Sequence, residues 1–414
     1  MRKPLTVLML GAALAAPAQS ETRKSEPAHR KLMVVSVDGL DWRYIRDREK
    51  LGLKIPNITR LLKKSAWADG VVGVWPTVTW PSHTSIITGV RPDQHGILNN
   101  GRGTLDPALS YWSADKLKAR TLWQCAGDAG LTTAAVTWPV TMNAKITWNL
   151  PEVFIRRNGG SMDLESVQKY GTPGLVEEIT RAYPSFPQQW VDDRTRALAT
   201  LYLLKTKKPD LVLTHLVDLD SDAHDRGPYT GEANATLERT DALIGDILKA
   251  LPKGYDFALV SDHGFELLDH VANLKALAAQ AGVTGDLKAM GGLVTTTDSK
   301  VADWLRGEAK KPGSDIGREV PHDELVKYAP TLGDAVAAFE PAPHVMFFGR
   351  DASGPVHVAP PEKGEHGFWP MREDYRSVFM LSGPGIKPEA LGQVQMLSLK
   401  DRLASAMGLS CPAN

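Results

Sequence analysis

Cysteine is scarce in this sequence, with two residues in a chain of 414. Because the two cysteines stand far apart in sequence, a cysteine-based metal or redox centre is not supported. An oxidising compartment would permit a bridge between Cys125 and Cys411, but Cys125 lies in an apolar run, 122–126, that is typical of a helix face. Because free cysteine commonly behaves as a small buried apolar residue, we favour two unbridged thiols and leave the disulfide open.

An excess of charge of either sign is also absent, since Lys plus Arg and Asp plus Glu each total 48. A protein without a strong basic field cannot hold a polyanion by releasing counterions. A gripped nucleic acid polymer is therefore excluded as a partner. The hydrophobic content of 43% excludes a disordered chain and indicates a folded protein with a large core.

Long apolar runs are missing except near the N-terminus. A basic start precedes the apolar run 5–16, and Ala16-Pro17-Ala18 fits the small-x-small pattern that signal peptidase cuts. We therefore expect a signal peptide over 1–18, a mobile mature N-terminus over 19–30, and a periplasmic or secreted protein. No later stretch approaches 18 uninterrupted apolar residues, so we expect no membrane anchor after cleavage.

Short β-prone runs alternate with helical patterns along the chain, which predicts an α/β fold with a mostly parallel central sheet and helices on both faces. A helical repeat of apolar residues over 233–251 predicts one helix packed on the core. Residues 264–365 show weaker strand periodicity, and we interpret them as containing an inserted cap. The predicted strands are Leu32–Val37, Thr133–Thr137, Leu211–His215, Phe257–Val260 and Val378–Leu381.

Acidic and imidazole side chains follow three of these predicted strands. Asp38 comes directly after the first, Asp218 and Asp220 follow the third, and Asp262-His263 follow the fourth. Because ligands of open α/β sheets bind beyond the carboxyl ends of the strands, we expect these side chains to meet at one edge of the sheet.

A threonine stands at the start of a predicted helix. Pro81 suits the first turn of a helix that Gly89 would end, which leaves Thr79 beside free backbone N–H groups and the positive end of the helix dipole. Such a place attracts anions. A threonine hydroxyl is a poor nucleophile at neutral pH, so a nucleophilic role for Thr79 requires a base or a metal ion nearby.

The remaining candidates have the spacing of metal ligands. Asp220 and His224 share a face if the chain turns helically between them, and glycines on both sides of Glu365-His366 permit close backbone approach. Oxygen and nitrogen ligands of this kind suit zinc, with manganese and iron as less favoured ions. Taken singly, Thr79 reads as a helix cap and Asp220 with His224 as a surface pair.

Six ordered motifs over about 31–408 resemble those of the type I nucleotide pyrophosphatase/phosphodiesterase family, within the alkaline phosphatase superfamily. They are Asp38-Gly39, Thr79-Trp80-Pro81, Arg91 to Ile97, Asp220 with His224, Asp262-His263-Gly264 and Gly364 to Gly367. The resemblance implies that 31–414 form a single alkaline phosphatase-like catalytic domain, with the cap inside it.

The resemblance also implies the roles of the site residues. Two zinc ions per chain, roughly 4 Å apart, are expected. Thr79 is then the nucleophile and forms a phosphothreonine intermediate. The implied ligands are Asp220, His224 and His366 for one zinc, and Asp38, Thr79, Asp262 and His263 for the other.

Substrate contacts follow from the same resemblance. Asn100 and the Trp80 backbone N–H are expected to hold a phosphoryl oxygen, and the Trp80 ring to stack on a nucleobase. His215 occupies the family's other stacking position, where a tyrosine is expected, so tight nucleobase selection is not implied. We leave His83 and His95 as buried hydrogen-bonding residues, and Asp218 as either an orienting residue or a solvated acid.

The implied substrate is a small phosphoester such as a nucleotide. A threonine at position 79 disfavours sulfate ester hydrolysis, which needs a formylglycine there. Superfamily monoesterases supply a Lys-x-Arg pair, whereas the nearest basic residues here are Arg156 and Arg157, so a diester or pyrophosphate fits better. A phosphate monoesterase stays open, as does a metal-binding protein without turnover. The natural substrate and the oligomeric state are not predicted.

Overall fold

The computed structural model describes residues 1, 29–101, 111–153, 164–186, 191–349 and 351–412. The predicted signal peptide, except Met1, residues 19–28 of the predicted mobile segment, and Arg156 with Arg157 lie outside the described residues. Arg30 is described, and its backbone N–H donates to the Met407 carbonyl at 3.2 Å while its guanidinium pairs with Asp256. The chain is therefore held against the main body from Arg30 onward.

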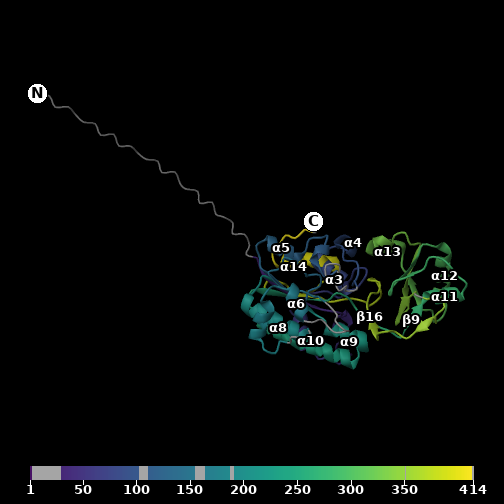
Figure 1. Cartoon of the computed structure of the whole chain (residues 1–414), viewed down its shortest axis with the longest axis horizontal. Coiled ribbons are helices and arrows are strands. Elements are labelled where there is room, and N and C mark those ends of the chain that lie inside the picture. The colour runs from purple at the N-terminus through teal and green to yellow at the C-terminus, as the bar shows by residue number, and fades with distance from the viewer. Residues whose placement is uncertain (2–28, 102–110, 154–163, 187–190, 350, 413–414) are drawn as a thin grey trace.

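An eight-stranded sheet forms the centre of the main body (Figure 1). All five predicted strands are present, and five neighbouring strands from β7 to β5 run parallel, whereas β17 is antiparallel to β7. Strands buried on both faces read as continuous apolar runs, which is why the sequence shows them. In spatial order the strands are β18 (Glu389–Ala390), β2 (Ala66–Trp67), β17 (Phe379–Ser382), β7 (Tyr255–Val260), β1 (Lys31–Val37), β6 (Leu211–Leu216), β4 (Thr133–Val136) and β5 (Trp148–Leu150).

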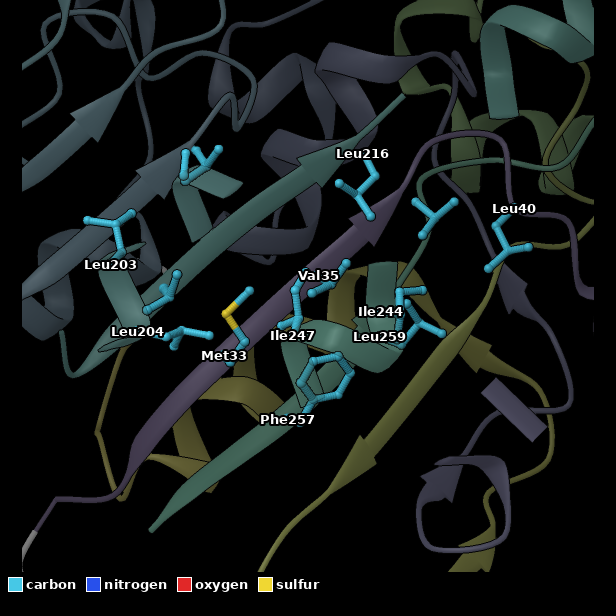
Figure 2. Packing of buried hydrophobic residues seen from close by; sticks show 14 of the residues in the cluster. Met33, Val35, Leu40, Leu203, Leu204, Leu216, Ile244, Ile247, Phe257 and Leu259 are labelled. Carbon is cyan, nitrogen blue, oxygen red and sulfur yellow. The ribbon is translucent and has the colours of Figure 1, made fainter. Parts of the chain in front are cut away.

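Helices cover both faces of this sheet, and successive residues of β1 point alternately into two hydrophobic clusters. Met33 and Val35 pack in the first cluster, part of which Figure 2 shows, and Leu32 and Val34 in the second. The first face is covered by α2 (Pro56–Leu62), α6 (Leu164–Tyr170), α7 (Leu175–Ala182), α8 (Asp193–Tyr202) and α10 (Gly231–Ala250), and the second by α3 (Thr79–Thr88), α5 (Leu122–Asp128) and α14 (Leu399–Ala406).

The predicted helix over 233–251 is α10, which begins two residues earlier. Thr230 caps it by accepting a hydrogen bond from the Ala233 N–H, and Leu237, Ile244 and Ile247 are buried against the sheet. No helix among the described residues is both long and apolar enough to cross a bilayer.

The two cysteines are bridged, so the preference for free thiols is wrong. Cys125 lies on the buried face of α5, as predicted, but Cys411 in the C-terminal tail packs into the same cluster, and the two Cα atoms are 5.6 Å apart. The bridge joins positions 286 residues apart in the sequence. Disulfides that close such long loops restrict the unfolded chain and typically stabilise a protein by about 2–4 kcal/mol.

Residues between His270 and Val358 build a smaller lobe, drawn in green beside the main body in Figure 1, with its own hydrophobic cluster. The lobe overlaps the stretch in which the sequence predicts a cap, and its strands of two to five residues explain the weak periodicity. One sheet contains β10 (Lys288–Ala289), β11 (Val294–Thr296), β13 (Ala337–Pro341) and β12 (Ile316–Glu319), and the other β14 (Val345–Phe348), β9 (His270–Asn273) and β15 (His357–Val358).

Shorter elements connect these parts. The helices of the lobe are α11 (Leu274–Gln280), α12 (Ser299–Ala309) and α13 (His322–Tyr328). Outside it, the remaining helices are α1 (Trp42–Arg46), α4 (Pro92–His95) and α9 (Asp218–Arg226), and two strand pairs are β8 (Glu266–Leu267) with β16 (Gly364–Glu365) and β3 (Val71–Val72) with β19 (Val394–Gln395).

Candidate active site

The carboxyl ends of three adjacent parallel strands bring most of the predicted ligands together. Asp38 directly follows β1, Asp262 and His263 follow β7, and α9, which begins just after β6, carries Asp220 and His224. Because β6, β1 and β7 are neighbours in that order, their following loops share one edge of the sheet. His366 reaches the same edge from the residue after β16.

Asp220, His224 and His366 form a first ligand group, with ligand atoms within 4.8 Å of one another. The Nε2 atoms of His224 and His366 lie 3.5 and 3.9 Å from Asp220 Oδ1. The helical spacing of Asp220 and His224 on α9 produces their approach, as the sequence predicts.

Asp38, Asp262 and His263 form a second group that adjoins the first. His263 Nε2 lies 3.2 Å from Asp38 Oδ1 and 3.1 Å from Asp262 Oδ2. The His263 ring stacks on the His366 ring of the first group, with centroids 3.8 Å apart. The structure thus gathers the six carboxylate and imidazole ligands into the two sets expected from the sequence.

Unsatisfied buried atoms show that these residues suit cations. Asp38 Oδ1, Asp220 Oδ1, Asp262 Oδ2 and His263 Nε2 are buried without a hydrogen-bond partner among the described residues. Buried polar atoms normally have partners, because an unpaired one costs about 1–3 kcal/mol. Zinc is commonly bound by carboxylate oxygens and imidazole nitrogens, and both adjacent groups contain such atoms without a hydrogen-bond partner.

The acidity of the carboxylates reflects their burial and, after that, the negative charge of their neighbours. Burial, reinforced by repulsion from Asp38, raises the pKa of Asp220 to about 7 and that of Asp262 to about 6. Burial on its own would also raise the pKa of Asp38, but the hydrogen bond from His215 and the nearby imidazole of His263 hold it well below its usual value. Asp38 is therefore charged, and its charge makes the other two reluctant to ionise.

Gly39 allows the backbone to pass between the two groups. Its φ of +65° lies in the left-handed region, and a Cβ at this position would stand 2.9 Å from the Phe265 ring and 3.4 Å from Asp220 Oδ1. Its N–H donates to Asp262 Oδ1 at 3.2 Å. A larger residue would strain the backbone between Asp38 and the next helix and would force the Phe265 ring to shift.

Thr79 is the first residue of α3, and its neighbours tie it to both ligand groups. The Thr79 carbonyl accepts a hydrogen bond from His83 Nδ1 at 2.8 Å, and the same nitrogen lies 3.5 Å from Asp262 Oδ2. On the other side, the Thr77 carbonyl accepts from the Gly367 N–H at 3.1 Å, next to His366. Val78 is the cap residue and makes no side-chain cap, so Thr79 does not act as the helix cap.

Asn100 lies beside the start of α3. Its Oδ1 accepts a hydrogen bond from the Trp80 N–H at 2.8 Å, so the two groups expected to hold a phosphoryl oxygen contact each other. Trp80 is 6% exposed; its ring packs edge-on against Trp112, and its Nε1 donates to Glu152 Oε1 at 2.8 Å. In this structure the ring is thus mostly covered.

His215, the other residue expected to stack on a nucleobase, is buried in this structure, and its ring contacts two carboxylates. The residue is 1% exposed, and its ring bridges Asp38 Oδ2 and Glu152 Oε2, each 2.9 Å from one ring nitrogen. Burial alone would lower the pKa of His215, but hydrogen bonds to Asp38 and Glu152 raise it to about 10. A positively charged His215 beneath Asp38 holds that carboxylate in place.

Glu152 and Glu362 also lie at the site, although no sequence pattern indicates them. Glu152 joins His215 to Trp80, as described above, and stands two residues after β5. Glu362 Oε2 lies 2.7 Å from His224 Nδ1, which also contacts the Gly364 carbonyl at 3.0 Å. Partners on the second ring nitrogen orient a histidine so that the first nitrogen can bind a metal.

His83, His95 and Asp218 are the three polar residues to which the sequence assigned no ligand role. His83 and His95 are fully buried and hydrogen-bond the hydroxyls of Ser36 and Ser85, so their predicted structural role is confirmed. Asp218 accepts a hydrogen bond from the Asp193 N–H at 3.2 Å and touches none of the six ligands through a described hydrogen bond.

A cleft of about 640 Å³ opens beside the first ligand group, between the main body and the smaller lobe. His366 and Val78 line it at the site, and the lobe contributes Met290, Tyr328 and Met346. Its apolar and aromatic lining suits the organic part of a bound molecule.

The carboxylate pKa values predict how zinc stabilisation depends on pH. In the metal-free protein, the raised pKa values of Asp220 and Asp262 contribute stability that is present below about pH 4 and is lost as the pH rises through about 6–7. Zinc requires the ionised carboxylates, so the gain in Tm on adding zinc to chelator-treated protein should grow from pH 5 to pH 8. A gain that is constant over this range, measured by thermal unfolding, would contradict the assignment.

Sequence comparison relates the chain to known hydrolases. The family model described as type I phosphodiesterase / nucleotide pyrophosphatase matches residues 32–362. Human ectonucleotide pyrophosphatase/phosphodiesterase family member 1 is 27% identical over 246 residues, covering 56% of this chain and 23% of the relative. Venom phosphodiesterase 2 of Crotalus adamanteus is 26% identical over 260 residues, covering 58% and 28%. The match spans about a quarter of the length of these relatives.

Solved structures share the fold. Murine ectonucleotide pyrophosphatase/phosphodiesterase 5 matches with a TM-score of 0.61 and 18% identity, over 93% of this chain and 97% of that chain. The same murine protein as an inactive threonine-to-alanine variant in complex with AMP gives a TM-score of 0.62 at the same identity. The fold is therefore alkaline phosphatase-like, and because the family model covers most of the chain, this protein belongs to the type I phosphodiesterase/nucleotide pyrophosphatase family.

Proposed function

We propose that this protein is a two-zinc phosphodiesterase or nucleotide pyrophosphatase that hydrolyses its substrate through a phosphothreonine intermediate. The observation that carries the proposal is the pair of adjacent ligand groups beside Thr79, each with buried oxygen or nitrogen atoms that lack a hydrogen-bond partner. One zinc is assigned to Asp220, His224 and His366, and the other to Asp38, Thr79, Asp262 and His263.

Thr79, Asn100 and Trp80 have different roles in the proposed reaction. Two divalent cations would lower the pKa of the Thr79 hydroxyl and neutralise charge on the phosphoryl oxygens. The Thr79 hydroxyl loses its proton to solvent as its oxygen attacks phosphorus, and the bond to the leaving oxygen, which takes up a proton from solvent, breaks. The phosphoryl group stays on Thr79 until water hydrolyses the ester. The Asn100 amide and the Trp80 N–H, which contact each other in this structure, separate to hold one phosphoryl oxygen.

A small phosphoester such as a nucleotide is the proposed substrate. The names of the relatives include nucleotide pyrophosphatase and phosphodiesterase, and one structural neighbour was solved with AMP. We assign the organic part of the substrate to the cleft beside His366 and keep the Trp80 ring as a further contact. Residues 31–414 are proposed as one catalytic domain with a cap within 264–365, and 1–18 as a signal peptide that directs the protein to the periplasm or out of the cell.

Diester preference follows from the charges at the site. Among the described residues, the side-chain ion pairs of Asp38, Asp220 and Asp262 involve histidines only. With two zinc ions bound, these carboxylates would have no Lys or Arg beside them to meet the additional negative charge of a monoester, so a diester fits better.

Rates on three substrates test this function. We expect zinc-loaded protein to cleave thymidine 5'-monophosphate p-nitrophenyl ester and bis-p-nitrophenyl phosphate with a kcat/KM at least about 100-fold above that for p-nitrophenyl phosphate. Preference for p-nitrophenyl phosphate would favour a phosphate monoesterase instead. No turnover of any of the three would favour a metal-binding protein without activity.

Glu152 is proposed as a positioning residue for Asp38. The change Glu152→Gln removes the charge that holds the His215 imidazolium, and we expect a loss of about 10–100-fold in zinc affinity with a matching fall in activity at limiting zinc. Glu49→Gln, on a side chain that is 90% exposed, is the control. Excess zinc should restore activity to Glu152→Gln, whereas unchanged zinc affinity would show that Glu152 only supports packing.

A further inference from the structure

A further group of potential metal ligands lies in the smaller lobe, outside the candidate active site. His270, Asp315 and His357 place one nitrogen or oxygen atom each within 4.8 Å of the others. His270 Nε2 lies 2.7 Å from Asp315 Oδ1, and His357 Nε2 lies 2.7 Å from Asp315 Oδ2. Neither the proposed reaction nor the family comparison uses these three residues.

Strand pairing fixes the positions of the two histidines. His270 and His357 are the first residues of β9 and β15, which pair antiparallel so that His357 stands opposite Ala272. Residues two apart on a strand share a face, so His270 and His357 are diagonal neighbours on one side of the sheet. Asp315 directly precedes β12, and its carbonyl accepts a hydrogen bond from the Ala342 N–H at 2.8 Å.

Burial and charge make the carboxylate unusual. Asp315 is 9% exposed, and in the part of the chain that the structure describes its ion pairs are with these two imidazoles and with no Lys or Arg. A buried carboxylate needs a positive partner, and two imidazoles with one carboxylate are three protein ligands of an open zinc site. The His357 side chain is 61% exposed, which leaves the fourth position open to water.

We propose that His270, Asp315 and His357 form a third divalent-cation site, which takes zinc in preference to calcium or magnesium. Imidazole nitrogens select zinc over the hard cations that prefer oxygen. Ligands at 2.0–2.1 Å in tetrahedral geometry stand about 3.3 Å apart, so binding must open the 2.7 Å contacts slightly. The exposed His357 can make that movement.

The site lies at the far end of a ribbon that carries two active-site ligands. The segments 266–273 and 357–365 pair antiparallel twice, as β8 with β16 and as β9 with β15, and the Leu268 N–H donates to the Lys363 carbonyl between them. His263 and His366 adjoin the near end, whereas His270 and His357 stand at the far end. A cation there would cross-link the two strands and stabilise the lobe.

Zinc content of the full chain tests the site. After dialysis against a low zinc concentration, the unmodified protein should retain one more zinc per chain than His357→Gln, by elemental analysis. His322→Gln, which removes an exposed histidine of the same lobe, is the matched control and should keep the full content. Added zinc should also raise the Tm of chelator-treated His322→Gln more than that of His357→Gln.

Equal zinc content in the unmodified protein and His357→Gln would overturn the proposal and leave a hydrogen-bonded cluster only. If His357→Gln does not fold, Asp315→Asn, which keeps the shape of the side chain, provides the same comparison. The test does not depend on the proposed reaction. If the active site bound no zinc, the zinc content of every variant would fall equally, and the unmodified protein would still hold one more zinc per chain than His357→Gln.

Discussion

Thr79→Ala should reduce kcat/KM for thymidine 5'-monophosphate p-nitrophenyl ester by about 10³-fold or more, because the variant lacks the oxygen that attacks phosphorus. Its zinc content should stay unchanged, since the six carboxylate and imidazole ligands remain. Rate and elemental analysis on the same preparation separate loss of the nucleophile from loss of the metal.

Two substitutions in α3 control this experiment. Thr79→Ser keeps a hydroxyl and should retain measurable activity, whereas Thr88→Ala removes a buried hydroxyl that donates to the Thr84 carbonyl within the same helix. Thr88→Ala should be less stable yet active. Full activity in Thr79→Ala would end the nucleophile assignment and support the reading as a metal-binding protein.

Asp262→Asn should lower the activity by about 100-fold or more and remove at least one zinc per chain. The side chain is fully buried, and the uncharged amide leaves His263 and Asp38 without the second carboxylate of their group. Treatment of the unmodified protein with a chelator should have the same effect on activity, and added zinc should reverse it.

Asp256→Asn is the matched control for this variant. Asp256 lies on β7, six residues before Asp262, and is equally buried, but it pairs with Arg30 on the opposite end of the strand. Its replacement should lower stability without changing the zinc content. Retention of all zinc by Asp262→Asn would contradict the second ligand group.

The central sheet and the meeting of acidic and imidazole side chains at its edge could be predicted because the strands, and the residues that follow them, are visible in the local sequence. The assignment of each side chain to a metal ion came from the family resemblance. Strands buried on both faces, such as β1 and β6, are continuous apolar runs. Asp38 and Asp262 directly follow or nearly follow such runs, and the carboxyl ends of parallel strands meet at one edge. The side chains come together because β7, β1 and β6 are neighbours in the sheet.

Features that depend on tertiary contacts were missed. Glu152 obeys the same strand-end rule, but β5 has three residues, one of them Asn149, and does not read as a strand. His215 belongs to β6 itself, so the strand fixes its direction, and its buried ring contacts Asp38 and Glu152. The pairing of Cys125 with Cys411 depends on the C-terminal tail packing against α5, which no local pattern encodes.

Diffraction at the zinc absorption edge, from crystals grown with zinc, tests the central claim most directly. We predict two anomalous peaks at the sheet edge about 4 Å apart, one in each ligand group, with the Thr79 hydroxyl directed at the ion held by Asp38, Asp262 and His263. A ligand group without a peak, or a Thr79 hydroxyl directed away from both ions, would contradict the account.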